Sequence, residues 1–226
     1  LEEIKKVADR CAILNRGRLI DVLDVKETST RKMANLMVGR EVSLETPKKE
    51  PEFGKEVLKV EHMTVVNQDH FEVVKDVSFT VHGGEIFAIA GVAGNGQIEV
   101  ADAIAGLLPL HKGKVWLNGK DITEESIRRR ALEGISYIPE DRQNYGIVMD
   151  FTLSENLGLR SYFREPFSRK GILDKKAFDS YAEDLIDKYD IRSGQGLRTV
   201  VRSMSGGNQQ KAIIAREIEQ ESDLMI

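Results

Sequence analysis

The feature that most constrains the fold is a glycine-rich segment, Gly91-Val92-Ala93-Gly94-Asn95-Gly96-Gln97-Ile98. An apolar run, residues 85–90, precedes it, and an apolar-periodic stretch, residues 99–104, follows it. Strand, glycine-rich loop and helix in this order are typical of a loop that cradles phosphate groups with its backbone N–H groups, helped by the positive end of the helix dipole. An ordinary glycine-rich turn is the alternative that this segment alone leaves open.

The loop fits the pattern G-x-x-x-x-G-K-[ST] except at its last two positions, where Gln97 and Ile98 stand. In that pattern the lysine supplies charge to the outer phosphates and the hydroxyl binds Mg²⁺. Gln97 has no charge and Ile98 has no oxygen. One charge pair at about 4 Å and an effective dielectric of about 20 is worth about 4 kcal/mol before desolvation. We therefore expect phosphate binding by the backbone but poor hydrolysis. The candidate residues are Gly91, Ala93, Gly94, Asn95, Gly96, Gln97 and Ile98.

Composition predicts a globular protein with one full domain and a remainder. The chain has 226 residues, 41% hydrophobic and 31% charged, with a net charge of −4 that does not require nucleic acid as a partner. Cys11 has no second cysteine to pair with, which favours a reducing compartment. No apolar run approaches the ~20 residues of a membrane span, and no signal peptide opens the chain. Both ends read as cut, so we expect a fragment of a longer polypeptide.

The first 56 residues predict small elements and a linker. Apolar spacing favours a helix over Leu1–Cys11, a hairpin turns at Asn15-Arg16-Gly17, and a second short helix covers residues 28–38. These pieces cannot bury a core alone, so residues 1–40 are interpreted as the C-terminal tail of a preceding domain. Residues 41–56 carry Pro, Gly and mixed charge and are interpreted as a linker.

From residue 57 the pattern changes to alternating strands and helices. The expected strands are residues 57–66, 73–81, 114–117 and 135–138, together with a buried strand over Ile86–Ala90. The expected helices are residues 99–105, stopped by Gly106, and then 127–132, 152–163 and 174–189. Residues 164–171 and 192–199 read as loops.

Two further segments carry candidate chemistry. Glu140-Asp141-Arg142 follows a strand, and in open α/β sheets ligands bind at that edge, although a solvated charge cluster is the alternative. Ser205-Gly206-Gly207-Asn208-Gln209 opens an apolar-periodic helix. Ser205 is a candidate cap, and the first-turn N–H groups can bind an anion. A capped surface helix is the alternative for this segment.

Together these motifs resemble the nucleotide-binding domain of ABC transporters. Ser205, Gly206, Gly207, Asn208 and Gln209 are similar to the signature motif of that family, and Tyr137–Glu140 is similar to its Q-loop, with Glu140 where glutamine is usual. The resemblance is closer to the tandem ATPases of sugar and nucleoside importers, and residues 161–174 look more like the nucleoside members. It covers residues 57–226 as a second domain, truncated before its Walker B acid, while the start of the chain resembles the end of the first domain.

The resemblance implies an α/β P-loop NTPase fold of ABC type, with an antiparallel β subdomain and a helical signature subdomain. It implies an ATP-binding subunit that hydrolyses ATP, with Mg²⁺, at a composite site between two domains. This domain would give the signature motif and a degenerate Walker A loop, and the fragment alone would be inactive. The implied partners are the first nucleotide-binding domain, transmembrane permease subunits and a periplasmic or lipoprotein solute-binding protein, at the cytoplasmic face of the membrane.

Several alternatives stay open at this stage. A non-hydrolysing nucleotide-binding module is compatible with the degenerate loop, whereas a non-transport ABC ATPase would be expected to carry basic arms or coiled-coil insertions. A kinase or GTPase would leave the signature segment unexplained. Phe71 is a candidate to stack on adenine, with Gln68 as the other occupant of that place and a core role as the alternative for Phe71. The four histidines show no metal-ligand spacing, so no metal site is predicted from them.

Overall fold

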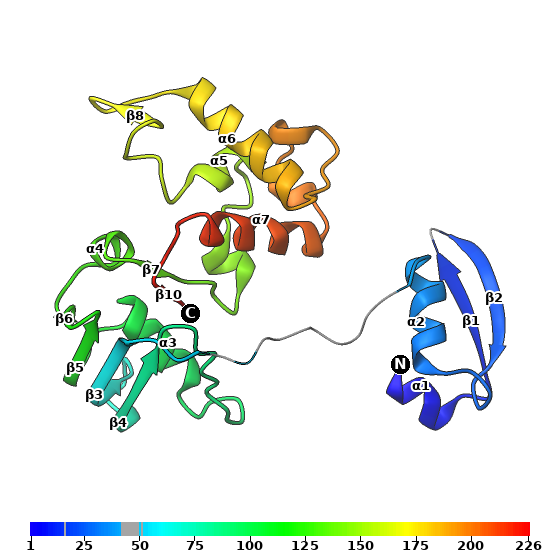
Figure 1. Ribbon diagram of the computed structural model, residues 1–226, viewed down its shortest axis with the longest axis horizontal. Helices are drawn as coiled ribbons and strands as arrows, with labels where there is room; N and C mark the ends of the chain where they lie inside the picture. The colour runs from blue at the N-terminus through cyan, green and yellow to red at the C-terminus, as the bar shows by residue number, and fades with distance from the viewer. Residues whose placement is uncertain (16, 42–49, 51) are drawn as a thin grey trace. The chain divides into compact units, whose positions relative to one another are not determined.

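The computed structural model describes residues 1–15, 17–41, 50 and 52–226. It divides into two compact units, Leu1–Glu50 and Pro51–Ile226 (Figure 1). Most of the predicted linker, residues 41–56, lies outside the described residues. Within the described ranges, no helix has both the length and the apolar character needed to cross a membrane.

The first unit is a two-stranded hairpin packed against a helix. The strands β1 (Arg10–Asn15) and β2 (Arg18–Asp24) pair antiparallel, as the turn signal predicts, although Arg16 itself lies outside the described residues. The helix α2 (Thr30–Val38) begins after Ser29, whose hydroxyl accepts a hydrogen bond from the Lys32 N–H at 3.2 Å. The core of this unit is formed by buried apolar side chains, namely Ile13, Leu23, Val25 and Met33.

The helix predicted over Leu1–Cys11 is wrong in its second half. The helix α1 covers only Glu2–Val7, and Cys11 belongs to β1, where it pairs with Leu23. Val7, the last residue of α1, is 84% exposed. The apolar spacing is compatible with a helix, but the strand ladder with β2 satisfies the backbone of this segment and buries Ile13.

The second unit contains an antiparallel sheet with the strand order β4-β3-β5-β6. Its strands are β3 (Glu56–Val66), β4 (Glu72–His82), β5 (Lys112–Leu117) and β6 (Lys120–Asp121). The predicted strands at residues 57–66, 73–81 and 114–117 correspond to β3, β4 and β5. Asn118 and Gly119 close the last hairpin with φ values of 49° and 78°, the left-handed conformation that this residue pair favours in two-residue turns.

Helix α3 covers one face of this core. The buried side chains of the sheet, including Leu58, Val60 and Val115, share one apolar cluster with Val100 and Ile104 of α3. This helix spans Gln97–Ala105 and ends at Gly106, whose φ is 85°. The helix α4 (Ile127–Leu132) leads into β7 (Ile135–Ser136), which pairs in parallel with β10 (Leu224–Met225).

The buried strand predicted over Ile86–Ala90 is wrong. Residues 85–90 form no strand, and Ile86, Phe87 and Ile89 are 76%, 42% and 46% exposed. A buried strand needs hydrogen-bonded neighbours, and in the described residues no strand pairs with this segment. Its one ring contact is a stacking of Phe87 on Phe79 of β4, with ring centroids 4.9 Å apart.

The remaining helices gather at the other end of the second unit (Figure 1). These are α5 (Leu153–Gly158), α6 (Lys175–Lys188) and α7 (Gly206–Ile218). They enclose a second apolar cluster whose fully buried members include Leu153, Leu157, Leu185, Val201 and Ile213. A short helical turn at Arg142–Gly146 precedes α5, and two more, at Gly196–Arg198 and Val201–Ser203, connect α6 to α7.

Two details of this helical part differ from the sequence expectation. The helix expected to reach Phe163 ends at Gly158, where the Phe178 ring of α6 lies so close that an added Cβ would meet it at 1.9 Å. The expected loop of residues 164–171 contains the first strand of a short hairpin, β8 (Ser168–Arg169) with β9 (Ile172–Leu173). Lys170 and Gly171 turn this hairpin with φ values of 51° and 79°.

Candidate functional site

The glycine-rich loop joins residues 85–90 to α3 in the conformation that its glycines permit. Gly94 and Gly96 have φ values of 87° and 96°, in the left-handed region. Gly96 is needed for a second reason, because a Cβ there would lie 2.7 Å from the carbonyl oxygen of Val73 in β4. The loop is therefore held against the sheet edge through backbone atoms, while residues 91–95 stay exposed.

The Gln97 side chain folds back over this loop. Its amide nitrogen Nε2 donates a hydrogen bond to the Val92 carbonyl oxygen at 3.1 Å. A Cβ at Gly91 would lie 2.4 Å from the same nitrogen, so the amide occupies the space that Gly91 leaves open. Gln97 thus stands where the phosphate-binding lysine of the pattern stands, but it offers a neutral amide, and the loop gains no positive charge from it.

The start of α3 is compatible with an anion such as a phosphate. No side chain caps it, since its N-cap is Gly96, and the first α-helical hydrogen bond recorded there runs from Val100 N–H to the Gly96 carbonyl at 2.9 Å. The preceding N–H groups are the donors that a phosphate would use, and the positive end of the helix dipole adds an electrostatic attraction. A Mg²⁺ ion fits less well, because Ile98 is apolar and 49% exposed at the position of the hydroxyl ligand. Nor do the described residues contain a cluster of three His, Cys, Asp or Glu side chains suited to a metal.

The second candidate segment forms the start of α7. Ser205 is the N-cap residue, but its hydroxyl does not cap the backbone, which corrects the sequence expectation. Its Oγ accepts a hydrogen bond from Asn208 Nδ2 at 2.9 Å, and Asn208 Oδ1 in turn accepts one from Arg192 N–H at 2.8 Å. The Ser205 hydroxyl therefore satisfies none of the first N–H groups of α7, although the Ser205 carbonyl accepts hydrogen bonds from the N–H groups of Asn208 and Gln209, each at 3.0 Å. Gly207 faces open space, with no atom within 4 Å of an added Cβ.

Gln209 fixes α7 to the preceding turn. Its side chain is 2% exposed, and its Nε2 donates a hydrogen bond to the Val201 carbonyl oxygen at 3.0 Å. Gln209 Oε1 has no partner in the described residues. In this structure Gln209 therefore holds the segment in place, while Ser205, Gly206 and Gly207 form its outer edge.

The structure brings together two segments that the sequence singled out separately. Arg142, from the charged loop after β7, extends to the start of α7, where its Nη2 would lie 2.7 Å from a Cβ added at Gly206. Arg142 Nε is buried and has no hydrogen-bond partner in the described residues. Asp141 caps the π-helical turn that carries Arg142, accepting hydrogen bonds from the N–H groups of Gln143 and Asn144, each at 3.0 Å. The pattern of residues gave no signal for this contact, because 64 positions separate Arg142 from Gly206 in the sequence.

No atom of Glu140, Phe71 or the glycine-rich loop is among those that lie nearest to a Cβ added at Gly206. Glu140 is exposed, directly before the turn that carries Arg142. Phe71 is 70% exposed, so the alternative that it is a core residue is wrong. A hollow of about 530 Å³ beside the loop is lined by strand β4, residues 87–90 and α3, and by no residue of the segment 205–209. A site that joins the loop to the signature segment of this same chain is therefore not present among the described residues.

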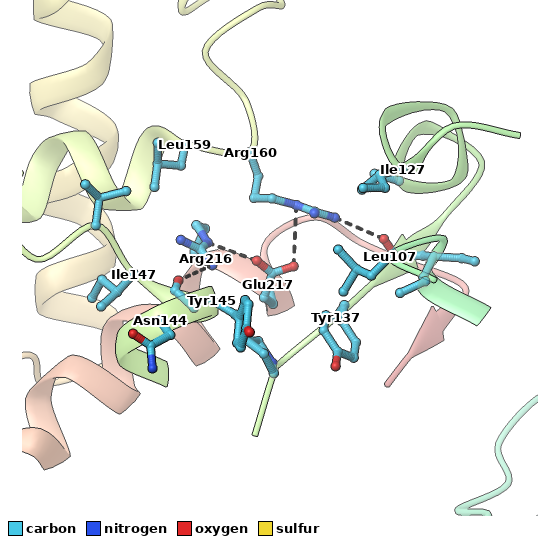
Figure 2. A pocket seen from close by; sticks show the side chains of 16 residues that line it. Leu107, Ile127, Tyr137, Asn144, Tyr145, Ile147, Leu159, Arg160, Arg216 and Glu217 are labelled. Carbon is cyan, nitrogen blue, oxygen red and sulfur yellow. Dashed lines mark hydrogen bonds and ion pairs between the residues drawn. The ribbon is translucent and has the colours of Figure 1, made fainter. Parts of the chain in front are cut away.

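A cavity of about 310 Å³ lies between the elements next to the sheet (the ends of α3, α4 and β7) and the helices α5 and α7 (Figure 2). Three charged side chains, Arg160, Arg216 and Glu217, line it. Figure 2 shows Glu217 of α7 between Arg216 and Arg160. The Arg216 Nε pairs with one Glu217 oxygen at 2.9 Å and the Arg160 Nε with the other at 3.5 Å. Glu217 is 1% exposed, so its charge is compensated inside the protein rather than by water.

The same cluster ties α7 to its neighbours through backbone groups. Arg160 Nη2 donates to the Ile135 carbonyl of β7 at 3.1 Å, and Arg216 Nη2 donates to the Gly146 carbonyl at 2.9 Å. Ser136 Oγ donates to the Glu217 carbonyl at 3.0 Å. Burial lowers the pKa of Arg216, although the nearby Glu217 opposes that shift. The helix α7, which begins at the segment 205–209, is therefore fixed to β7 at its other end.

Tyr137 lines the same cavity and lies close to the end of β7. Its hydroxyl donates a hydrogen bond to Asp102 of α3. Burial and the Asp102 carboxylate both raise the pKa of Tyr137, so the phenol stays protonated at neutral pH. Tyr137 thus connects the segment before Glu140 to the helix that follows the glycine-rich loop.

Comparison with known proteins identifies a family. A sequence model described as "ABC transporter" matches residues 74–226. The chain is 44% identical over 220 residues to the guanosine import ATP-binding protein NupO of Bacillus subtilis, covering 97% of this chain and 43% of that protein. It is 39% identical to the nucleoside import ATP-binding protein NupA of Lactococcus lactis, covering 100% of this chain and 44% of that protein. The chain therefore spans less than half the length of these relatives.

Solved structures support the same fold. An ATP-binding cassette of an ABC transporter in its ADP conformation matches with a TM-score of 0.57 and 19% identity, over 76% of this chain and 67% of that one. A nucleotide-free cassette matches with a TM-score of 0.58 and 21% identity, over 76% and 68% of the two chains. These matches agree with the predicted α/β fold of the P-loop NTPase type, with an antiparallel β part and a helical part.

Proposed function

The chain belongs to the ABC transporter family of ATP-binding proteins, and we propose that it is part of the ATP-binding subunit of a nucleoside importer. In this proposal residues 57–226 form the second nucleotide-binding domain of a tandem protein, and residues 1–40 end the first. The nucleoside is favoured over a simple sugar because relatives named for guanosine and nucleoside import are 44% and 39% identical, whereas a relative named for ribose import is 34% identical.

One observation carries the proposed division of labour: Gly207 is open at the start of α7, while Gln97 leaves the phosphate loop of the same domain uncharged. The open edge formed by Ser205, Gly206 and Gly207 would contact the γ-phosphate of an ATP bound on the first domain. That composite site would hydrolyse ATP, with the Mg²⁺ held chiefly by groups of the first domain. The loop at residues 91–98 would hold nucleotide through backbone N–H groups with little turnover.

The proposed partners follow from this assignment. Glu140 and the cavity beside Tyr137 would face the permease subunits, at the cytoplasmic side of the membrane, and a periplasmic or lipoprotein solute-binding protein would deliver the nucleoside. Arg142 is suited to connect the permease-facing surface to the start of α7. It follows Glu140 by two residues in the sequence, and its side chain lies against Gly206. ATP is the ligand that the site requires, and nucleic acid has no role in it.

The test is the steady-state ATPase activity of the full-length parent protein assembled with its permease and a guanosine-loaded solute-binding protein. Gly207→Asp is expected to abolish turnover, because it puts a carboxylate against the γ-phosphate, while Gln97→Ala is expected to change turnover less than about twofold. Gly194→Asp is the matched control, since a Cβ at this exposed glycine also meets nothing within 4 Å and lies outside the signature segment.

The opposite result would overturn the proposal. If Gln97→Ala stops turnover and Gly207→Asp does not, the loop of this domain is the working site. If Gly194→Asp inhibits as strongly as Gly207→Asp, the loss reflects misfolding rather than the signature segment. Stimulation by ribose in place of guanosine would leave the ATPase assignment intact and overturn only the nucleoside.

A further inference from the structure

A short hairpin in the helical part has no role in the nucleotide site. It consists of β8 and β9 and runs directly into α6, and in Figure 1 it extends outward from the helices around it. Its base is firmly held, because Phe167 is 7% exposed and its ring lies 5.3 Å from that of Phe178 and 5.0 Å from that of Tyr181. The tip is therefore a fixed projection of the fold.

The tip combines aliphatic side chains with a local excess of positive charge. Ile172 is 76% exposed and Leu173 is 57% exposed. Residues 168–176 contain four cations and one carboxylate, a net charge of +3 in a chain whose net charge is −4. The four cations, all exposed, are Arg169, Lys170, Lys175 and Lys176. We call these four cations, with Ile172 and Leu173, the basic tip.

The cations of the basic tip are only partly compensated inside the protein, where Lys175 lies close enough to the Glu155 carboxylate to help lower its pKa. Among the described residues, only Arg169 of the four forms an ion pair, to Glu165 at 3.8 Å, and both side chains of that pair are more than three-quarters exposed. Such a pair contributes little to stability. Asp174 is already engaged as the N-cap of α6, where it accepts hydrogen bonds from two backbone N–H groups.

Two of these cations also stand where a helix disfavours them. Lys175 and Lys176 occupy the first turn of α6, which has no acidic residue. The positive end of the helix dipole lies in this turn, so lysines there reduce the stability of the helix rather than add to it. A local departure from good helix chemistry at an exposed projection indicates that the charge serves an external contact.

We propose that the basic tip binds the surface of an anionic lipid membrane. The hollow lined by these residues is shallow, which suits a flat surface better than a peptide side chain. Ile172 and Leu173 would enter the boundary between headgroups and acyl chains, while the lysine and arginine stems extend to the phosphates. Each such cation contributes an electrostatic attraction that needs no specific headgroup and falls off within about 10 Å of the membrane surface at 0.1 M salt. Because this contact does not require nucleotide, the ATPase test and the membrane-binding test can give independent results.

The experiment is co-sedimentation of the full chain with vesicles of phosphatidylcholine alone and with vesicles that also contain phosphatidylglycerol. Binding is expected to the anionic vesicles and to weaken as salt is raised. Lys170→Gln with Lys175→Gln is expected to lower the partition coefficient about twentyfold, and Ile172→Ser with Leu173→Ser about tenfold. Lys55→Gln with Lys112→Gln is the matched control, since it removes the same charge from two exposed lysines away from the hairpin, one directly before β3 and one in β5, and should leave binding within about twofold.

Three results would overturn the proposal. The first is equal binding to neutral and anionic vesicles. The second is an equal loss of binding in the variant that carries Lys170→Gln and Lys175→Gln, called here the hairpin variant, and in the control variant, each with an unchanged circular dichroism spectrum. The third is a loss of affinity of the hairpin variant for permease reconstituted in neutral lipid, with no loss on protein-free anionic vesicles. That third result would assign the basic tip to a protein partner instead.

Discussion

Two adjacent glycines at the start of α7 meet different surroundings, and this difference can be measured. A Cβ at Gly207 meets no atom within 4 Å, whereas one at Gly206 would meet Arg142 Nη2 at 2.7 Å. Both lie in the first turn of a helix, where alanine is preferred to glycine. We expect Gly207→Ala to raise the free energy of unfolding by about 0.5–1 kcal/mol in urea denaturation. Gly206→Ala should give no such gain, because Arg142 must move.

The Arg142 side chain supplies the control for this prediction. If Arg142 is what opposes a methyl group at position 206, then Gly206→Ala combined with Arg142→Ala should recover most of the stability gain over Arg142→Ala alone. Equal effects of the two single glycine substitutions would show that Arg142 does not lie against Gly206 in solution. The contact between the loop after β7 and the start of α7 would then be absent.

At the scale of elements, α5 begins with a capping box that makes its stability depend on pH. Glu155 accepts hydrogen bonds from the Thr152 N–H at 2.8 Å and hydroxyl at 2.7 Å, and Thr152 Oγ accepts one from Glu155 N–H at 3.3 Å. The hydrogen bonds from Thr152 lower the pKa of Glu155 below its ordinary 4.5. A lowered carboxyl pKa stabilises the fold above the unfolded value, and this contribution is lost as pH falls through the folded pKa.

Glu155→Gln should therefore reduce stability at neutral pH and have little effect in acid. We expect a loss of no more than about 1 kcal/mol, because the carboxylate is exposed. The difference from wild type should close as pH falls below the unfolded value of 4.5, measured by urea denaturation across that range. Glu183→Gln, at an exposed position of α6, is the control for the change from carboxylate to amide. If the stability of Glu155→Gln is lower than that of wild type by the same amount at all pH values, the loss comes from the shape of the amide and not from the missing charge.

The elements that sequence predicts well are those whose signals are local. The helix α6 follows its N-cap Asp174 and α2 follows its N-cap Ser29. In both, the cap residue and the apolar residues that mark the helical period are neighbours in the sequence. The run at residues 85–90 fails because its burial depends on strands elsewhere, and Ile86 is 76% exposed without them. The same limit applies to the candidate site. Gln97 and Ile98 can be identified from spacing alone, but the pairing of Arg160 with Glu217 joins positions 57 residues apart, with no pattern to reveal it.

At the scale of the whole molecule, two units with separate cores predict two separate unfolding events. Met33 is fully buried in the first unit and Met63 in the second, so each tests one core. Truncation of a buried methionine to alanine costs about 2–5 kcal/mol. The first unit has about 50 residues and few buried apolar side chains, and a domain of that size is only marginally stable. Met33→Ala is therefore expected to unfold it at 25 °C.

Hydrogen exchange followed by mass spectrometry separates the two cores. Met33→Ala should remove protection from peptides of β1, β2 and α2 and leave those of β3, β4 and β5 unchanged. Met63→Ala should do the reverse, because Met63 packs among the buried residues of the sheet and not with those of the hairpin. If Met33→Ala also removes protection from β3 and β5, the two units unfold as one cooperative structure. The first forty residues would then be part of the stability of the second unit, rather than the tail of a separate domain.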